Sequence, residues 1–200
     1  MARVIAVLAA IAALALPSIV LARSLDETKN NYVQAQTSTG GAKVLLSSTQ
    51  VAVADGETVD NQNVAFALSS DCSTPCYTSA VAVQVVLVAG SPSTFAPQNV
   101  ALAVNSNCTG CGAYAYAWQY VAQTDKNAHL TGKARHEIDD LSRQIDQLTR
   151  NTTPVDFATD NQLTASLKTL TGQIKTIVDS DLRSNGHENR GREHLEIESD

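Results

Sequence analysis

The 200-residue chain has almost no charge through its middle third and no cluster of positive charge anywhere. Asp71 is the only charged residue within residues 61–124. The net charge is −6, and phosphate binding needs a basic patch that this sequence lacks. We therefore expect no nucleic-acid partner.

The sequence also lacks a recognisable catalytic constellation. It contains no Gly-x-Ser-x-Gly elbow and no phosphate-binding glycine loop. His136-Glu137 is the one suggestive dyad, but Asp140 stands where the helix of a zinc protease has its second histidine. His187 and His194 lie in a segment that we predict to be disordered, and such a segment cannot hold a preorganised site. We therefore predict no catalytic residue, no cofactor, and a protein that is not an enzyme.

The first 22 residues have the pattern of a secretory signal peptide. Arg3 precedes an apolar stretch over residues 4–16, Pro17 breaks it, and residues 20–22 form a small-residue cleavage pattern. An uncleaved anchor is the alternative, because the apolar stretch approaches the ~20 residues of a spanning helix. No later segment reaches that length. We predict a secreted or extracytoplasmic protein, associated with the cell envelope, that has no membrane span after cleavage.

The sequence contains an internal repeat. Residues 62–68, Gln-Asn-Val-Ala-Phe-Ala-Leu, recur as Gln-Asn-Val-Ala-Leu-Ala-Val at 98–104, and a second run at 80–86 matches 115–121. Each copy therefore contains a run, a turn with two cysteines, and a second run. Large and small side chains alternate within the runs, and Gly, Pro, Ser and Asn bound them. This pattern predicts strands.

The predicted fold class is α+β: a duplicated antiparallel β-hairpin module of about six strands, a C-terminal two-helix hairpin and a disordered tail. The hairpins are the two copies, 61–90 and 97–124. Leucine and isoleucine at helical spacing predict helices at about 132–149 and 159–181. The predicted boundaries are 1–22 for the signal peptide, 23–41 for a flexible leader, 42–124 for the β-rich repeat domain, 125–183 for the helical hairpin and 184–200 for the disordered tail.

Four cysteines occupy matched points of the two copies, where each predicted hairpin turns. An oxidising compartment favours two disulfides, and pairing within each copy lets each copy close by itself. Such small loops contribute roughly 2 kcal/mol each to the free energy of unfolding. The alternatives are a zinc site made of all four thiolates and a thiol-redox site. The cysteines are Cys72, Cys76, Cys108 and Cys111.

Four aromatic residues near the end of the second copy are spaced by two, so in a strand they all point to one face. The matched positions of the first copy carry valines, which favours packing in a core. A binding face for sugar rings or an apolar partner is the alternative. The opposite face is rich in alanine and allows another layer, the helices or another chain, to approach closely. The aromatic row consists of Tyr114, Tyr116, Trp118 and Tyr120.

The runs at 63–67, 82–88 and 99–105, taken with their cysteine pairs, carry a family resemblance. They resemble the C-terminal extracytoplasmic double-cysteine repeat domain of bacterial peptide zinc metalloprotease proteins. The resemblance covers about residues 61–148. It implies an exported accessory domain without protease function, because the His-Glu-x-x-His motif of that family has no match here.

These observations together predict a non-enzymatic exported structural or binding module at the cell envelope, stabilised by two local disulfides. Its partner would be an unknown envelope protein or glycan. A zinc-binding or thiol-redox protein that uses the four cysteines is one alternative. A self-assembling β-repeat protein, and hence a homo-oligomer, is another, because residues 81–88 are uncharged and strongly β-forming.

Overall fold

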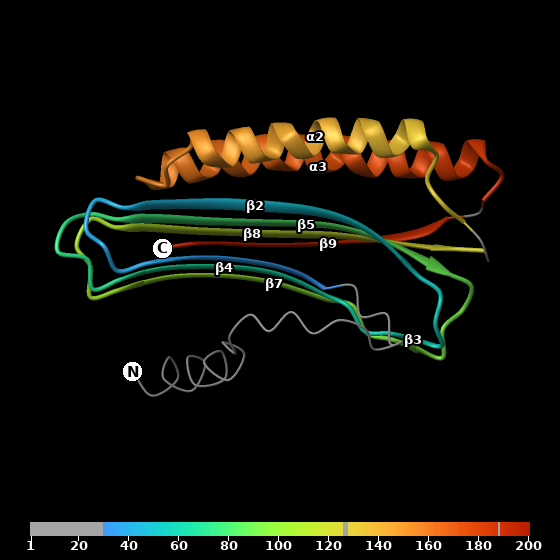
Figure 1. The fold of residues 1–200 in the computed structure, drawn as a ribbon, viewed down its shortest axis with the longest axis horizontal. Coiled ribbons are helices and arrows are strands. Elements are labelled where there is room, and N and C mark those ends of the chain that lie inside the picture. Colours follow the sequence, from blue (N-terminus) through green and yellow to red (C-terminus); the bar gives the residue numbers. More distant parts are fainter. Residues whose placement is uncertain (1–29, 126–127, 188) are drawn as a thin grey trace.

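The computed structural model describes residues 30–125, 128–187 and 189–200. In this range the chain winds as a parallel β-solenoid, in which each coil lays one strand onto each of two main sheets (Figure 1). The two sheets lie face to face, and two helices cover the outer side of one of them. The described range is thus α+β, with nine strands and two helices.

Three coils build the solenoid, and the first two add a short strand in a minor sheet. The first main sheet is parallel, in the order β1 (Asn31–Thr37), β4 (Gln62–Ser70) and β7 (Gln98–Ser106). The second has the order β2 (Lys43–Ala54), β5 (Tyr77–Ala89), β8 (Gly112–Thr124) and β9 (Arg190–Ser199). Its first three strands are parallel, and β9 is antiparallel to β8. The minor sheet pairs β3 (Thr58–Val59) with β6 (Thr94–Phe95).

The two copies of the repeat stack on each other with equivalent residues side by side. Gln62 pairs with Gln98 and Asn63 with Asn99 across β4 and β7. The prediction of antiparallel hairpins with about six strands is therefore wrong. The two runs of one copy lie in different sheets, because the cysteine turn carries the chain from one sheet to the other. Each run pairs in parallel with its equivalent in the other copy, as in solenoid repeats, where neighbouring units bury matching faces.

The space between the two main sheets is filled by small side chains. Most of the residues in this layer are alanines, with no more than 4% of their surface exposed. Alanine faces let two sheets approach closely, and the layer that covers the alanine face is the other sheet of the same chain. The prediction that the helices or another chain would cover it is therefore wrong. The buried alanines are Ala35, Ala65, Ala67, Ala80, Ala82, Ala103, Ala113, Ala115 and Ala117.

The helices α2 (Gly132–Asn151) and α3 (Phe157–Ser184) cover the other face of the second sheet, where the side chains are large (Figure 1). The Thr131 side chain accepts a hydrogen bond from the Ala134 N–H at the start of α2, and Asp156 does the same for the Thr159 N–H in α3. Asp181, near the end of α3, accepts from both the backbone and the hydroxyl of Thr131. The last turn of α3 is thereby tied to the first turn of α2.

Two segments that the sequence predicts to be irregular are strands. β1 lies in the predicted leader, 23–41, and β9 lies in the predicted disordered tail, 184–200. Almost every side chain of β9 is exposed, and the alternation is short, because Leu195 and Ile197 are its apolar residues. Its order comes from backbone pairing along β8. The predicted signal peptide, 1–22, lies outside the described residues.

Neither of the described helices combines the length and the apolar character needed to cross a membrane.

Candidate functional site

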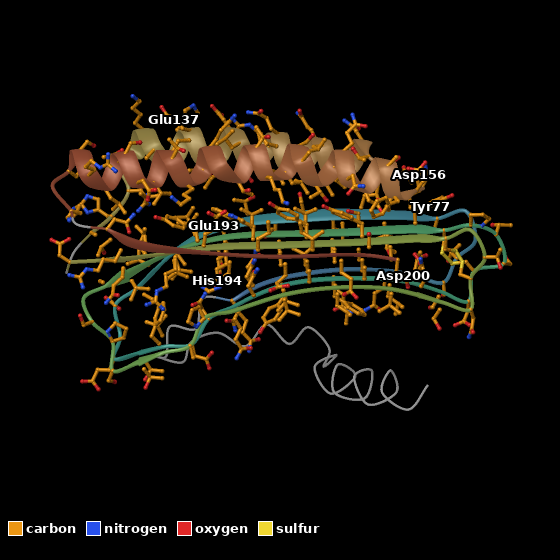
Figure 2. The ribbon with its side chains drawn as sticks, turned by 180° about the vertical axis from the view of Figure 1, so that it is seen from behind. Tyr77, Glu137, Asp156, Glu193, His194 and Asp200 are labelled. Atoms are coloured by element: carbon orange, nitrogen blue, oxygen red, sulfur yellow. A yellow bond between two sulfur atoms is a disulfide. The ribbon has the colours of Figure 1, made fainter. Side chains whose placement is uncertain are left out.

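The cysteine turns gather at one end of the solenoid, where yellow sulfur atoms appear near the labelled Tyr77 (Figure 2). Cys72 is paired with Cys76 and Cys108 with Cys111 at disulfide distance, which confirms the local pairing. The stacking of the coils also brings the two pairs together, and all four sulfurs lie within 4.8 Å of one another. The Sγ atoms of Cys76 and Cys111 are 3.5 Å apart. The disulfide prediction did not require this contact between the two copies, and only the zinc alternative, which uses all four cysteines, did.

The two cysteine turns share an unusual backbone conformation. Asp71 and Asn107, each just before the first cysteine of its pair, have φ angles of 52° and 51°. Asp and Asn adopt this left-handed region more readily than other residues that have a Cβ. The side-chain amide of Asn107 donates to the Asp71 carboxylate at 3.0 Å and links the two turns across the coils. Matching strain and a direct bond therefore fix where both cysteine pairs start.

The aromatic row is part of the core. Its four rings are 0–1% exposed and lie between the second sheet and α3. This confirms the core interpretation that the matched valines favoured. It also corrects the alternative of an open binding face, because α2 and α3 cover the rings that a ligand would have to reach.

The polar atoms of this row are hydrogen-bonded to the elements that cover it. The Tyr114 and Tyr116 hydroxyls bond to Thr164 (2.9 Å) and Thr171 (3.1 Å) of α3. The indole N–H of Trp118 donates to Glu193 of β9 at 2.7 Å. Burial raises the pKa of Tyr116 to about 12, so its phenol stays protonated as a hydrogen-bonding group. The row therefore positions α3 and β9 as well as filling space.

Tyr120, the last ring of the row, lies in a small polar network. Its hydroxyl donates to the Asp179 carboxylate and accepts from the Asn189 side-chain amide at 2.9 Å. Lys175 pairs with Asp179 at 2.8 Å, and its ammonium lies 5.2 Å from the centre of the Tyr120 ring. Burial, together with the neighbouring Asp179, raises the pKa of the Tyr120 phenol. This network fixes the chain where it leaves α3 and enters β9.

Two ladders of side-chain amides run across the coils. In the first, Asn31 donates to Asn63 at 2.9 Å, and Asn63 donates to Asn99 at 2.8 Å. Stacked amides of this kind stabilise in-register parallel strands, because each amide both donates and accepts. The sequence carried a signal for them, since asparagine and glutamine recur at matched points of both copies. The second ladder joins Gln50, Gln84 and Gln119, with distances of 2.7 and 2.9 Å.

β9 closes the last coil by two routes. Its backbone pairs with β8, and its side chains reach the neighbouring edge of β7. The Glu198 carboxylate accepts from the backbone N–H of Ala103 at 3.1 Å, and the Asp200 carboxylate accepts from that of Asn105 at 3.0 Å. Glu193 and His194 project from β9 in opposite directions (Figure 2). β9 and the residue after it, Asp200, therefore cover the last edge of both main sheets, and we call residues 190–200 the C-terminal cap.

The outer face of the first sheet carries apolar side chains that no described helix or strand covers. Tyr32 is 56% exposed and Val100 is 43% exposed. The residues of this open face alternate with the alanines along β4 and β7. The sequence predictions concerned the alanines and not the residues between them. The apolar residues of the open face are Tyr32, Val64, Leu68, Val100, Leu102 and Val104, while Phe66, on the same side of β4, is 9% exposed and counts as buried.

The histidines of the sequence analysis lie apart from one another. His136 and Glu137 are on the outer side of α2, where His136 lies 3.9 Å from Asp140 and Glu137 forms an ion pair with Lys133 at 3.8 Å. His187 bonds to Asp125 at 2.6 Å. The backbone carbonyl of His194 accepts from Asn99.

Comparisons of the chain with protein-family models, with curated proteins and with solved structures found no match.

Proposed function

We propose that the protein is a non-enzymatic, exported structural or binding module at the cell envelope. The strongest support is that the buried polar side chains form hydrogen bonds within the fold. Asn63, Gln84 and the hydroxyl of Tyr116 are all directed into contacts that hold coils, sheets and helices together. A scaffold built in this way presents a fixed surface, which is what a structural or binding module needs.

The open face is the surface that such a module would offer. It is one side of a three-stranded sheet, and the asparagine ladder on the buried side holds its strands in register. A flat apolar sheet face suits the faces of sugar rings or an apolar protein surface. The proposed partner is therefore a glycan or protein of the envelope.

The binding role can be tested with a fluorescent reporter on the open face. Trp118 is buried, so it is first replaced by Phe, and Tyr32→Trp then places an indole on the open face. We expect the emission of this reporter to shift when purified cell-wall glycan or solubilised envelope protein is added. The matched control is Phe157→Trp in the same background, because Phe157 is 75% exposed on the helical side. Equal responses from both reporters, or from neither, would contradict binding through the open face.

Export can be tested separately by producing the full chain in a bacterium and measuring the intact mass of the envelope fraction. We expect a mature chain that starts at Arg23 and carries two disulfides. A chain of full length that stays in the cytoplasm would overturn the proposed location.

Self-assembly is a second candidate function, and the edge of the solenoid supports it. Within the described ranges, no strand pairs with the outer edge of β1 or of β2, whereas the C-terminal cap covers the opposite edge. An unpaired strand edge can pair with another chain. Pairing of this edge with the same edge of a second chain would give a two-fold symmetric dimer.

Sedimentation of the mature chain at increasing concentration tests this dimer. Val51, on β2, is 37% exposed. Val51→Lys would place like charges across the dimer interface, and we expect it to shift the equilibrium towards monomer. Val155→Lys is the control, because Val155 is 55% exposed and lies between the helices. A wild-type chain that stays monomeric at every concentration would refute this candidate.

A further inference from the structure

The four cysteines form one cluster made by two coils. Equivalent cysteines are 36 and 35 residues apart in the chain, which is one coil of the solenoid. Cys72 and Cys76 are buried, and Cys108 and Cys111 are half-buried. The largest separation between any two of the four sulfurs is 4.8 Å. A structural disulfide in each turn would need no such contact between the turns.

In the disulfide-bonded structure, sulfurs that belong to different turns lie within 4.8 Å of one another, which is near the separation in a tetrahedral metal–thiolate site. With a zinc–sulfur bond of about 2.3 Å, the four sulfurs of such a site lie about 3.8 Å from one another. Cys76 and Cys111, which belong to different turns, already have sulfurs 3.5 Å apart. The spacing within each turn, three residues in one and two in the other, is also that of the cysteine pairs that bind structural zinc.

The surrounding backbone supports thiolate ligands. The N–H of Cys76 donates to the Sγ of Cys111 at 3.2 Å, and a hydrogen bond of this kind stabilises negative charge on a ligand sulfur. The bond between Asn107 and Asp71 fixes one turn against the other. β5 and β8 begin directly after the two turns and are paired from their first residues, Tyr77 and Gly112. Contacts of the solenoid therefore hold the two turns together in addition to the bonds between the sulfurs.

We infer that the cluster is a two-state site, which holds two disulfides when oxidised and one Zn²⁺, bound by all four thiolates, when reduced. The reductant is a dithiol. Each disulfide takes two electrons and two protons from one dithiol, which closes to its own disulfide, and this leaves four thiols. Zn²⁺ then displaces four protons and binds the four sulfurs. Because all four positions are filled by protein ligands, the site is of the structural rather than the catalytic kind.

The test uses the mature chain, reduced with excess dithiol without oxygen, freed of reductant and titrated with Co²⁺ as an optical stand-in for Zn²⁺. We expect the absorption of a tetrahedral cobalt–thiolate site, saturation at one ion per chain, and full displacement by one equivalent of Zn²⁺. Native mass spectrometry gives the stoichiometry. Thermal unfolding supplies an independent readout, because bound Zn²⁺ should raise the melting temperature of the reduced chain.

Two controls separate a folded site from loose thiol binding. The double variant Cys72→Ser and Cys76→Ser keeps one pair of thiols, and we expect its affinity to fall by more than the roughly 100-fold that loss of an outer hydrogen bond to a ligand costs. The reduced wild-type chain in denaturant should also bind more weakly, because it lacks the stacked turns.

Three results would overturn the inference. One is a reduced chain that shows no tetrahedral thiolate spectrum. Another is a double variant that binds as tightly as the wild type. The third is an ion that is shared between two chains rather than held by one. None of these results bears on the open face or on export, so the proposed function is tested independently.

Discussion

The two edges of the solenoid are built from the same kind of parallel strand, yet they end in opposite ways. At the first edge, the outer sides of β1 and β2 have no partner strand within the described ranges. At the last edge, the C-terminal cap runs antiparallel to β8, and its carboxylates bond to backbone N–H groups of β7. A cap that reverses direction and carries charge cannot template another parallel coil.

This difference shows what limits the length of the stack. The amide ladders and the alanine layer would continue through any number of coils, since each coil presents the same groups to the next. The stack ends at a strand that lacks these repeated groups. β9 is that strand, and its many exposed charges, which made it look disordered in the sequence, are what suits it to a terminal position.

Removal of the C-terminal cap should have the largest effect. Ending the chain after Gly186 exposes the edges of β7 and β8, which are complementary to the open edges of β1 and β2 in another copy. We expect concentration-dependent fibres, because this contact between unlike edges does not close on itself. Sedimentation and thioflavin fluorescence measure them.

Two point variants of β9 serve as a weaker disruption and as a control. Gly191→Val keeps the length of the chain but places a side chain against the Tyr120 hydroxyl, so it should loosen the cap and cause weaker assembly. Glu196→Gln removes an exposed charge from β9 and should behave as the wild type. A truncated chain that stays folded and monomeric would show that the cap does not limit growth.

Breaking an amide ladder in the middle should have the next largest effect. Asn63 is fully buried, bonds to Asn31 and Asn99, and also donates to the backbone carbonyl of Trp118 at 3.0 Å. Asn63→Ala leaves several buried groups without partners, and we expect the free energy of unfolding to fall by about 2–4 kcal/mol in urea titrations. Gln62→Ala, one residue earlier and more exposed, should cost less than about 0.5 kcal/mol. Equal costs at both positions would argue against the ladder as a source of stability.

A smaller effect is expected where the aromatic row meets α3. Tyr116→Phe keeps the buried ring and removes only the hydroxyl that bonds to Thr171. The free energy of unfolding should fall by about 1 kcal/mol. Tyr77→Phe is the control, because Tyr77 lies at the start of β5, outside the aromatic row. A loss as large for Tyr77→Phe as for Tyr116→Phe would mean that the bond to α3 contributes nothing specific.

The smallest effect concerns Asp160 and depends on pH. Burial, with a smaller contribution from Asp156, raises the pKa of Asp160 from 3.8 to about 6. The folded state therefore binds the proton more tightly than the unfolded state, so stability falls as the pH rises from 3.8 to about 6. Asp160→Asn should raise the melting temperature at about pH 7 and leave it nearly unchanged below the unfolded pKa. Asp139→Asn, on the exposed side of α2, should show no such difference, and a similar gain there would assign the effect to net charge.

The helices were predictable because their signal is local. Leucine and isoleucine spacing predicted 132–149 and 159–181, and the observed helices are Gly132–Asn151 and Phe157–Ser184. The positions of most strands in the repeat were also predictable from alternation. Which strands pair was missed, because alternation describes the faces of a strand and not its neighbour. Asparagine and glutamine at equivalent points of both copies could have predicted the parallel pairing, since an amide ladder needs an amide at the same position of neighbouring strands.

The candidate sites divide in the same way. Local disulfide pairing followed from the even cysteine count and the duplicated turns. The contact between the two pairs was expected only under the zinc alternative, because the local disulfides do not require the coils to stack. The C-terminal cap was missed for a similar reason, since the partners of Glu198 and Asp200 lie 95 residues earlier in the chain.

That sequence distance also determines the order in which parts of the solenoid can form during synthesis. Glu193 in the C-terminal cap is made 75 residues after Trp118, its partner in β8. At typical rates of synthesis, roughly 4 to 15 s separate the two. During this interval the coils can already stack while their last edge has no cap. The helices, made in between, cover the apolar face first, so the backbone edge is the final surface of the described solenoid to be protected.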